Sequence, residues 1–324
     1  MAWLQKHPLE DEAQFVLSSF LGWPQDRLGS DEAELRELAM AWLRKHPLEN
    51  ETGFVLNSFL GWSQARLGSD EAELRELAMA WLRKHPLEDD TGFVFAPLLG
   101  WSQDRLGSDE AELCKLAIEW LEEFSNSLEA DFILKNLLPK DALSEGDRYK
   151  LCHRAIKLTE DREMLGDESH MLKTLLQLVP QRGDKVPKNE IITFACSWLD
   201  RHSVHPERIM VLARVLENLW LADHLWVALA QTALTELEAR DTEKLDDFAL
   251  NRVAQQVWGL DDSDQARWLR LACRWIEKWG AQESCLLLLN NYKQFYMLSI
   301  PDEVKVALNS ACLRRFGGNA IDWL

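Results

Sequence analysis

The stretch LAMAWLRKHPLE occupies residues 38–49, and the same twelve residues recur at 77–88. A slightly altered copy, MAWLQKHPLE, forms residues 1–10. Residues 40–78 and 79–117 are identical at 30 of 39 positions without a gap. Repetition at a fixed period of about 20–50 residues is typical of proteins built from stacked supersecondary units. The sequence therefore predicts a tandem-repeat protein.

The period is about 39 residues at the start of the chain and persists in weaker form toward its end. One tryptophan marks the phase in the first units: Trp3, Trp42, Trp81 and Trp120. The phase then continues, at spacings of roughly 37–41 residues, through a mixed set: Lys157, Trp198, Glu236, Trp275 and Arg314. We expect eight or nine repeats, near-identical in residues 1–123 and diverged in residues 124–324, where the same array continues.

The first half of each unit has the pattern of an amphipathic helix. Apolar residues recur at the i, i+3, i+4, i+7 and i+8 positions: Leu35, Leu38, Ala39, Trp42 and Leu43. Acidic residues at its start and basic residues at its end match the helix dipole. Ser30 or Asp31 is expected to cap this helix, and Pro47 is expected to end it.

A second, shorter helix is expected over about residues 50–60, with Phe54 and Phe59 among its apolar residues. Gly61 is placed to end it in the left-handed conformation. Apolar spacing predicts further helices over residues 144–159, 168–179, 189–202, 206–219, 222–239, 244–258, 263–279, 281–292 and 301–316. No long stretch alternates with period two, so the expected fold is all-α.

A pair of antiparallel helices cannot bury both of its faces alone, whereas stacked pairs can, and an α-solenoid results. The chain resembles the HEAT and tetratricopeptide families of helical repeats over essentially all 324 residues. Tetratricopeptide units have about 34 residues and a Trp–Leu-Gly–Tyr pattern that is absent here. The longer period of this chain is closer to that of HEAT units, although their usual Pro, Asp and Arg positions are not evident. The resemblance is therefore one of architecture, and it implies a binding role.

Composition excludes several functional classes. The net charge of −18 argues against binding to phosphate backbones, which requires clustered Lys and Arg. No apolar run approaches the roughly 18–20 residues of a membrane span, and residues 1–14 lack the apolar core of a signal peptide. The six cysteines show neither a paired framework nor a CxxC motif, so we expect free thiols and a cytoplasmic location.

The sequence contains no recognisable catalytic or cofactor motif. A Gly-rich phosphate loop, HExxH and GxSxG are all absent. Cys196, His202 and His205 come nearest to a metal site, but their spacing matches no strong template. The histidines that recur in each unit have the position of last-turn residues before a stopping proline: His7, His46 and His85. We predict no cofactor, no metal and no enzymatic activity.

One candidate contact surface lies on the first helix of each unit. Met40 falls roughly 130° from the centre of the apolar arc, between Arg36 and Arg44. Met79 and Ile118 repeat this position, so stacking aligns the three as a stripe. Methionine is common on adaptable recognition surfaces. The alternative is that the adjacent repeat buries the stripe.

A second candidate ladder consists of the tryptophans that follow the terminating glycines: Trp23, Trp62 and Trp101. Packing is the alternative for them too. Together these features predict a non-catalytic module that binds a protein ligand, in an oligomeric state that the sequence leaves open. An enzyme with a scattered active site and a purely structural spacer are the alternative functions.

The chain begins inside a unit, because residues 1–4 align with residues 40–43. We therefore expect it to be one part of a longer protein. Arrays of near-identical repeats resemble the C-terminal sensor regions of bacterial and fungal STAND NTPases, the NLR-like immune proteins. That resemblance implies ligand sensing coupled to an upstream nucleotide switch. No residue here matches the NTPase motifs, so only the sensor role carries over.

Overall fold

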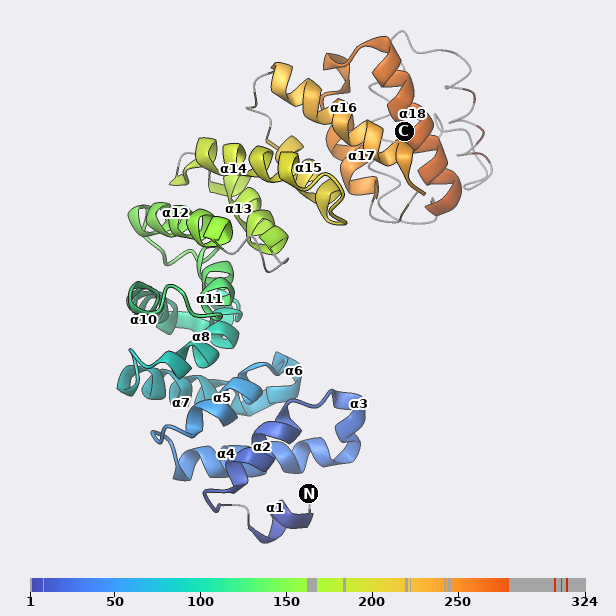
Figure 1. Cartoon of the computed structure of the whole chain (residues 1–324). Helices are drawn as coiled ribbons and strands as arrows, with labels where there is room; N and C mark the ends of the chain where they lie inside the picture. Colours follow the sequence, from blue (N-terminus) through green and yellow to red (C-terminus); the bar gives the residue numbers. More distant parts are fainter. Residues whose placement is uncertain are drawn as a thin grey trace. The chain divides into compact units, whose positions relative to one another are not determined.

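The computed structural model describes residues 2–7, 9–161, 168–182, 185–218, 221, 223–241, 243 and 246–279, with single positions at 306, 310 and 313. These residues form helices joined by turns and short loops, and no strand occurs among them (Figure 1). The all-α prediction is confirmed. Packing divides the chain into two compact units, residues 1–161 and 162–324, which are considered separately.

Unit 1 repeats a long helix, a short helix and a tight turn. The long helices are α4 (Glu32–Lys45), α7 (Glu71–Lys84), α10 (Glu110–Glu123) and α12 (Glu145–Asp161). The short helices are α2 (Ala13–Leu21), α5 (Thr52–Leu60), α8 (Gly92–Leu99) and α11 (Ala130–Leu137). The smallest elements are α1 (Ala2–Lys6), α3 (Gln25–Leu28), α6 (Gln64–Leu67), α9 (Gln103–Leu106) and the 3-10 turns η1 (Gly29–Asp31), η2 (Gly68–Asp70), η3 (Asp89–Thr91) and η4 (Gly107–Asp109).

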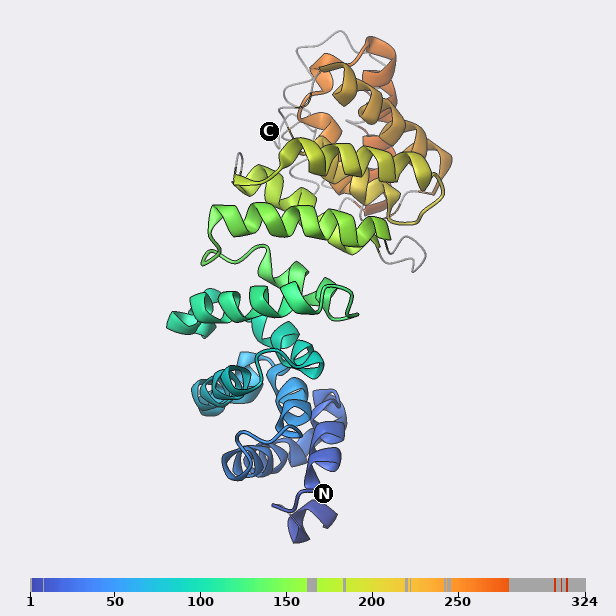
Figure 2. The ribbon, with the colours of Figure 1, turned by 60° about the vertical axis from the view of Figure 1, so that its left-hand side comes forward.

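The helices of unit 1 form two rows. Helices α2, α5, α8 and α11 contact one another in succession, and α4, α7 and α10 do the same beside them (Figure 2). Each short helix also packs on the long helices next to it. Stacking therefore buries the apolar faces that a single helix pair leaves open.

Tryptophans form the centre of each repeat in unit 1. Trp42, Trp81 and Trp120 are all buried, and the indole N–H of Trp81 donates to the backbone oxygen of Glu49 in the preceding loop at 2.8 Å. Trp3 shares their phase in the sequence, but its exposed fraction is 41%.

The positive φ expected at Gly61 occurs at Gly68 instead. Gly61 has φ −69° and ψ −10°, which is an ordinary helical conformation, and the chain continues through a further turn. Gly68 instead has φ 59° and ψ −127°, between α6 and η2. Only glycine adopts this region at little cost. The sharp change of direction therefore falls seven residues later than predicted, because the four-residue helix α6 intervenes.

The predicted N-terminal cap is also replaced by another contact. Asp31 has helical backbone angles and makes no capping hydrogen bond, because η1 leads directly into α4. Capping normally requires an extended residue at this position. In the next repeat the equivalent Asp70 forms an ion pair with Arg36, 3.1 Å away. Asp109 pairs with Arg75 in the same way, so these aspartates join consecutive repeats.

From α14 onward, the helices of unit 2 alternate between longer and shorter ones. Its helices are α13 (Glu168–Arg182), α14 (Lys188–Arg201), α15 (Arg208–Leu216), α16 (Asp223–Ala239), α17 (Asp246–Ala254) and α18 (Asp262–Trp279), with the 3-10 turn η6 (Val257–Gly259). Helices α13, α15 and α17 pack in succession, and α16 packs on α18. Each corresponds to a helix predicted from the sequence. The helices predicted over 281–292 and 301–316, together with Cys285 and Cys312, lie outside the described residues.

Candidate binding surface

A row of exposed phenylalanines runs along the short helices of unit 1. It contains one residue from each of α2, α5, α8 and α11, with exposed fractions of 41–66%: Phe15, Phe54, Phe93 and Phe132. The four helices contact one another in succession and form one row (Figure 2). The four phenylalanines occupy the same position of the repeat, 39 residues apart. Repeated exposure of a large aromatic side chain is unusual, and contiguous apolar patches often mark interaction sites.

The local sequence explains why these rings face outward. In α5 the buried side chains Val55, Leu56, Phe59 and Leu60 cover one arc of the helix. At about 100° per residue, Phe54 lies roughly 170° from the centre of that arc. The core cannot accept the Phe54 ring without exposing this buried set. The same pattern holds in α2, α8 and α11, whose buried residues lie on the side of the helix opposite Phe15, Phe93 and Phe132.

The loop before each phenylalanine is acidic and carries an exposed leucine. We call these four segments the phenylalanine edge: residues 9–15, 48–54, 87–93 and 128–132. The exposed leucines are Leu9, Leu48, Leu87 and Leu128. The segments contain three, two, three and two carboxylates respectively, and no Lys or Arg. The charged side chains of these segments are therefore all acidic, while two neighbouring cations, Lys45 and Lys84, donate to the backbone oxygens of Leu9 and Leu48 at 2.7 Å.

Several carboxylates of the edge remain available for a ligand. Glu49 and Glu88 contact the neighbouring histidines His46 and His85, each at 2.9 Å. Other acidic residues are exposed and form no ion pair within the described part of the chain: Glu12, Glu51, Asp89 and Asp90. These four supply uncompensated negative charge beside Phe15, Phe54 and Phe93.

The methionine stripe predicted as a contact surface is not exposed. Met40 and Met79 are each 1% exposed, and Ile118 is half-buried. Helices α4, α7 and α10 lie against each other as well as against the short helices, so their sides are covered. The structure thus has the alternative arrangement, in which the adjacent repeat buries the stripe.

The two arginines predicted beside the stripe contact the next repeat. Arg36 pairs with Asp70 and donates from Nη1 to the backbone oxygen of Arg66 at 3.3 Å. Arg44 makes two hydrogen bonds of 2.6 Å to the carboxylate of Glu73. These bonds lower the pKa of Glu73, and they raise that of Arg44. Both arginines therefore link α4 to the repeat that follows.

Two of the three tryptophans of the predicted ladder are packed inside the protein and are not exposed. Trp62 and Trp101 are buried, and each indole N–H donates to a backbone oxygen of the preceding repeat. The guanidinium of Arg66 lies 3.9 Å from the Trp62 ring centroid, and Arg105 covers Trp101 at 3.8 Å. Trp23 remains half-buried, beneath the guanidinium of Arg27 at 3.8 Å.

The recurring histidines are parts of the repeat junctions. His46 is buried and stacks on Trp42, with ring centroids 4.7 Å apart. Its Nε2 lies 3.2 Å from the backbone oxygen of Leu9, and its Nδ1 lies 2.9 Å from Glu49. Within the described residues, His46, Glu49 and the exposed Asp11 form one group with metal-ligand chemistry. Because His85 repeats the stacking and both polar contacts, we assign these histidines a structural role.

The three residues nearest to a metal motif in the sequence are engaged in local packing. The ring of His202 stacks on Trp198 at 4.6 Å, and its Nδ1 faces the Trp198 backbone oxygen. The backbone N–H of Glu207 donates to Nδ1 of His205 at 3.1 Å. Burial raises the pKa of the Cys196 thiol, which opposes formation of the thiolate that binds metals.

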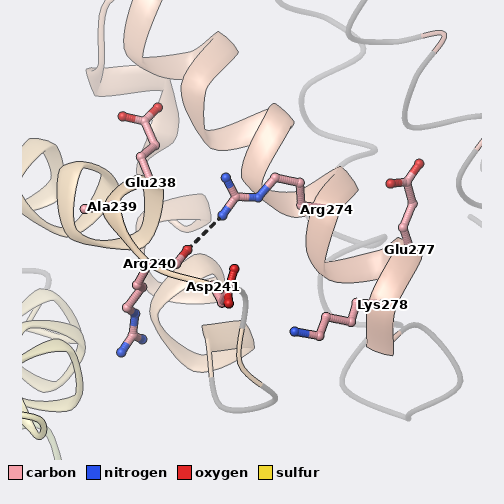
Figure 3. A pocket seen from close by; sticks show the side chains of 7 residues that line it. All are labelled: Glu238, Ala239, Arg240, Asp241, Arg274, Glu277 and Lys278. Atoms are coloured by element: carbon pink, nitrogen blue, oxygen red, sulfur yellow. Dashed lines mark hydrogen bonds between the residues drawn. The ribbon is translucent and has the colours of Figure 1, made fainter.

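A polar hollow of about 860 Å³ lies beside the C-terminal ends of α16 and α18 (Figure 3). Its lining consists of Glu238, Ala239, Arg240, Asp241, Arg274, Glu277 and Lys278. In Figure 3 the Arg274 guanidinium points to the backbone oxygen of Arg240, which accepts a hydrogen bond of 3.3 Å. The lining mixes both signs of charge and is not apolar. It therefore lacks the enclosed apolar character of a typical small-molecule site.

No protein-family model, curated protein or solved structure matches the chain. In the part of the chain that the structure describes, no helix is long and apolar enough to cross a membrane. The proposal about function therefore rests on the phenylalanine edge.

Sequence reasoning passed over the phenylalanine edge although a signal was present. The phenylalanines recur with the period of the repeat, at positions 15, 54, 93 and 132. The helical wheel of α5 already placed Phe54 opposite the other apolar residues. An apolar residue retained on the outer face of four successive helices is the signal that identifies such a surface.

Proposed function

We propose that the chain is an α-solenoid of about eight or nine HEAT-like or tetratricopeptide-like repeats that binds another protein and catalyses no reaction. The two-row packing of helices in unit 1, and the successive packing of α13, α15 and α17 in unit 2, support the repeat architecture. The phenylalanine edge is the observation that carries the binding role. Four exposed aromatic rings at one phase of the repeat are costly to keep in water, and aromatic residues are enriched at protein interfaces.

The alternative functions receive less support. A spacer needs no apolar residue on its outer face, whereas the edge has eight, namely a phenylalanine and a leucine in each of four segments. An enzyme needs a site in which reactive groups converge, and the polar hollow beside Arg274 is lined by side chains of both signs of charge. We further propose that the array serves as the sensor part of a larger NLR-like STAND protein and acts in the cytoplasm.

Site-specific photo-crosslinking tests the binding role. A benzophenone amino acid replaces Phe93 in one variant and Glu76, an exposed residue of α7, in the control variant. We expect one defined polypeptide to crosslink from position 93 and not from position 76. The polypeptide is identified by mass spectrometry and purified, and its affinity for the chain is measured.

The affinity measurement shows whether the phenylalanine edge binds this polypeptide. The double variant Phe54→Ser/Phe93→Ser should weaken binding at least about tenfold, because central aromatic anchors dominate interface energies. Its melting temperature should stay close to that of the wild type, since both rings are exposed. An unchanged affinity, equal crosslinking from position 76 or no crosslinked polypeptide contradicts the proposal.

A further inference from the structure

We propose that the phenylalanine edge binds a basic amphipathic helix of the partner protein. This inference rests on the proposed binding function and specifies the chemistry of the ligand. The partner helix places an apolar side chain against each phenylalanine in turn. Its Lys and Arg residues lie between these anchors and face the acidic loops.

The charge of the edge selects for a basic ligand. Its four segments hold ten carboxylates and no Lys or Arg. Glu12, Glu51, Asp89 and Asp90 have no ion-pair partner among the described residues, so a cation that approaches them displaces no existing contact. Complementary charge accelerates association and excludes like-charged competitors. The chain as a whole adds to this field with its net charge of −18.

The spacing of the row favours a helix as the ligand. Packed helices lie about 8–10 Å apart, so consecutive phenylalanines are separated by roughly that distance. A helix rises about 1.5 Å per residue and covers about 10 Å in seven residues, which is close to two complete turns. Anchors seven residues apart therefore stay on one face. A β-strand covers the same distance in three residues, so its successive anchors point to opposite faces.

Other occupants of an exposed apolar row fit the edge less well. A second copy of the chain would bring the same acidic loops against each other. A membrane rich in anionic lipid repels the edge for the same reason, because both surfaces are negative. Each of these occupants has a distinct outcome in the experiment.

The test uses labelled synthetic peptides and the full chain. The first peptide has about 28 residues, with Leu at every seventh position, Lys at flanking positions and Ala elsewhere. The second peptide has Glu in place of each Lys. The third has the composition of the first, but its Leu residues stand five apart. Binding is measured by fluorescence anisotropy at low and at high salt.

We expect the first peptide to bind, and its affinity to fall at least about tenfold on moving to high salt, since ionic screening weakens exposed charge pairs. The acidic and the re-spaced peptides should bind at least tenfold more weakly. The variants Phe54→Ser/Phe93→Ser and Glu51→Gln/Asp89→Asn/Asp90→Asn should each weaken binding by a similar factor. The control variant Glu37→Gln/Glu76→Gln removes exposed carboxylates from α4 and α7 and should leave binding unchanged.

Four results overturn the inference. They are equal binding of the acidic peptide, absence of binding by the basic peptide, a concentration-dependent dimer that the phenylalanine variant abolishes, and flotation of the chain with phosphatidylserine vesicles. The crosslinking experiment separates this inference from the proposed function. A crosslinked partner whose affinity depends on Phe54 and Phe93, in the absence of peptide binding, leaves the binding function intact and removes only the basic helix.

Discussion

The indole N–H of Trp62 donates a hydrogen bond of 2.8 Å to the backbone oxygen of Leu21, a residue 41 positions earlier. Leu21 is the last residue of α2, so its carbonyl group has no partner within the helix. Trp101 makes the equivalent bond to Leu60 at the end of α5. A side chain of one repeat thus completes the helix of the repeat before it.

This relationship predicts that Trp62→Phe destabilises the chain. The substitution keeps an aromatic ring but leaves the Leu21 oxygen buried without a donor, which costs about 1–3 kcal/mol. The matched control is Trp23→Phe, because Trp23 has the same repeat position but is half-exposed. Urea unfolding followed by circular dichroism measures both variants. Equal destabilisation by the two substitutions would show that the hydrogen bond between repeats contributes little.

We predict that a larger residue at position 53 destabilises the chain, because a side chain there would clash with a neighbouring ring. A Cβ atom at Gly53 would lie 2.8 Å from Cζ2 of the buried Trp81 ring. Gly53→Ala should therefore reduce the free energy of unfolding by about 1–3 kcal/mol. Gly61→Ala serves as the control, because its Cβ would meet only two carbonyl oxygens, at 3.6 and 4.0 Å, and its backbone is helical. A Gly53→Ala protein as stable as the control variant would contradict the close packing of α5 on Trp81.

Replacement of Met40 by Lys should destabilise the fold strongly. The Met40 side chain is 1% exposed, so the variant must bury an ammonium group or open the contact between repeats. We expect a loss of at least about 3 kcal/mol from the free energy of unfolding. Glu37→Lys, on the exposed face of the same helix, should change it by less than about 0.5 kcal/mol. Thermal denaturation of the two variants distinguishes a core position from a contact position.

The ion pairs between repeats predict a specific dependence on pH. Hydrogen bonds from Arg44 and Arg83 hold the pKa values of Glu73 and Glu112 below their usual range. A carboxylate with a lowered pKa contributes stability above its unfolded pKa of about 4.3, and this contribution disappears as the pH falls through the folded value. All four side chains are more than one-third exposed, so each pair contributes less than about 1 kcal/mol.

The double variant Arg44→Gln/Arg83→Gln tests this dependence. It should be slightly less stable than the wild type at pH 7, and the difference should shrink below about pH 4. Added salt should shrink it as well, because the pairs are exposed. Urea unfolding at several pH values measures the difference. If the difference in stability between the variant and the wild type grows on acidification, the ion pairs do not contribute as predicted.

Buried cysteines should resist alkylation in the folded chain. Burial raises the pKa values of the Cys114 and Cys152 thiols to about 12. Because the thiolate is the reactive form, neither residue should react with iodoacetamide at pH 8 until urea is added. Site-resolved mass spectrometry follows each cysteine separately. Rapid modification of Cys114 under native conditions would show that α10 opens readily.

The sequence by itself determined the helical class and the position of most helices. Identical twelve-residue stretches revealed the period, and the spacing of Leu35, Trp42 and Leu43 identified the long helix. Such features are local, since a helix shows its buried face within a few turns. The four-residue helices were missed because a segment as short as Gln64–Leu67 spans about one turn and shows no periodicity.

Only the tertiary structure decided which residues of each repeat contact the neighbouring repeats. Met40 is outside the apolar arc of its own helix, yet its side chain is buried, whereas Phe54 is apolar and about half exposed to solvent. Trp62 and Gly53 acquire their roles from Leu21 and Trp81, which belong to other helices. A helical wheel describes one helix and its preferred buried side. Stacking covers additional sides, and which ones are covered depends on how the neighbouring helices pack.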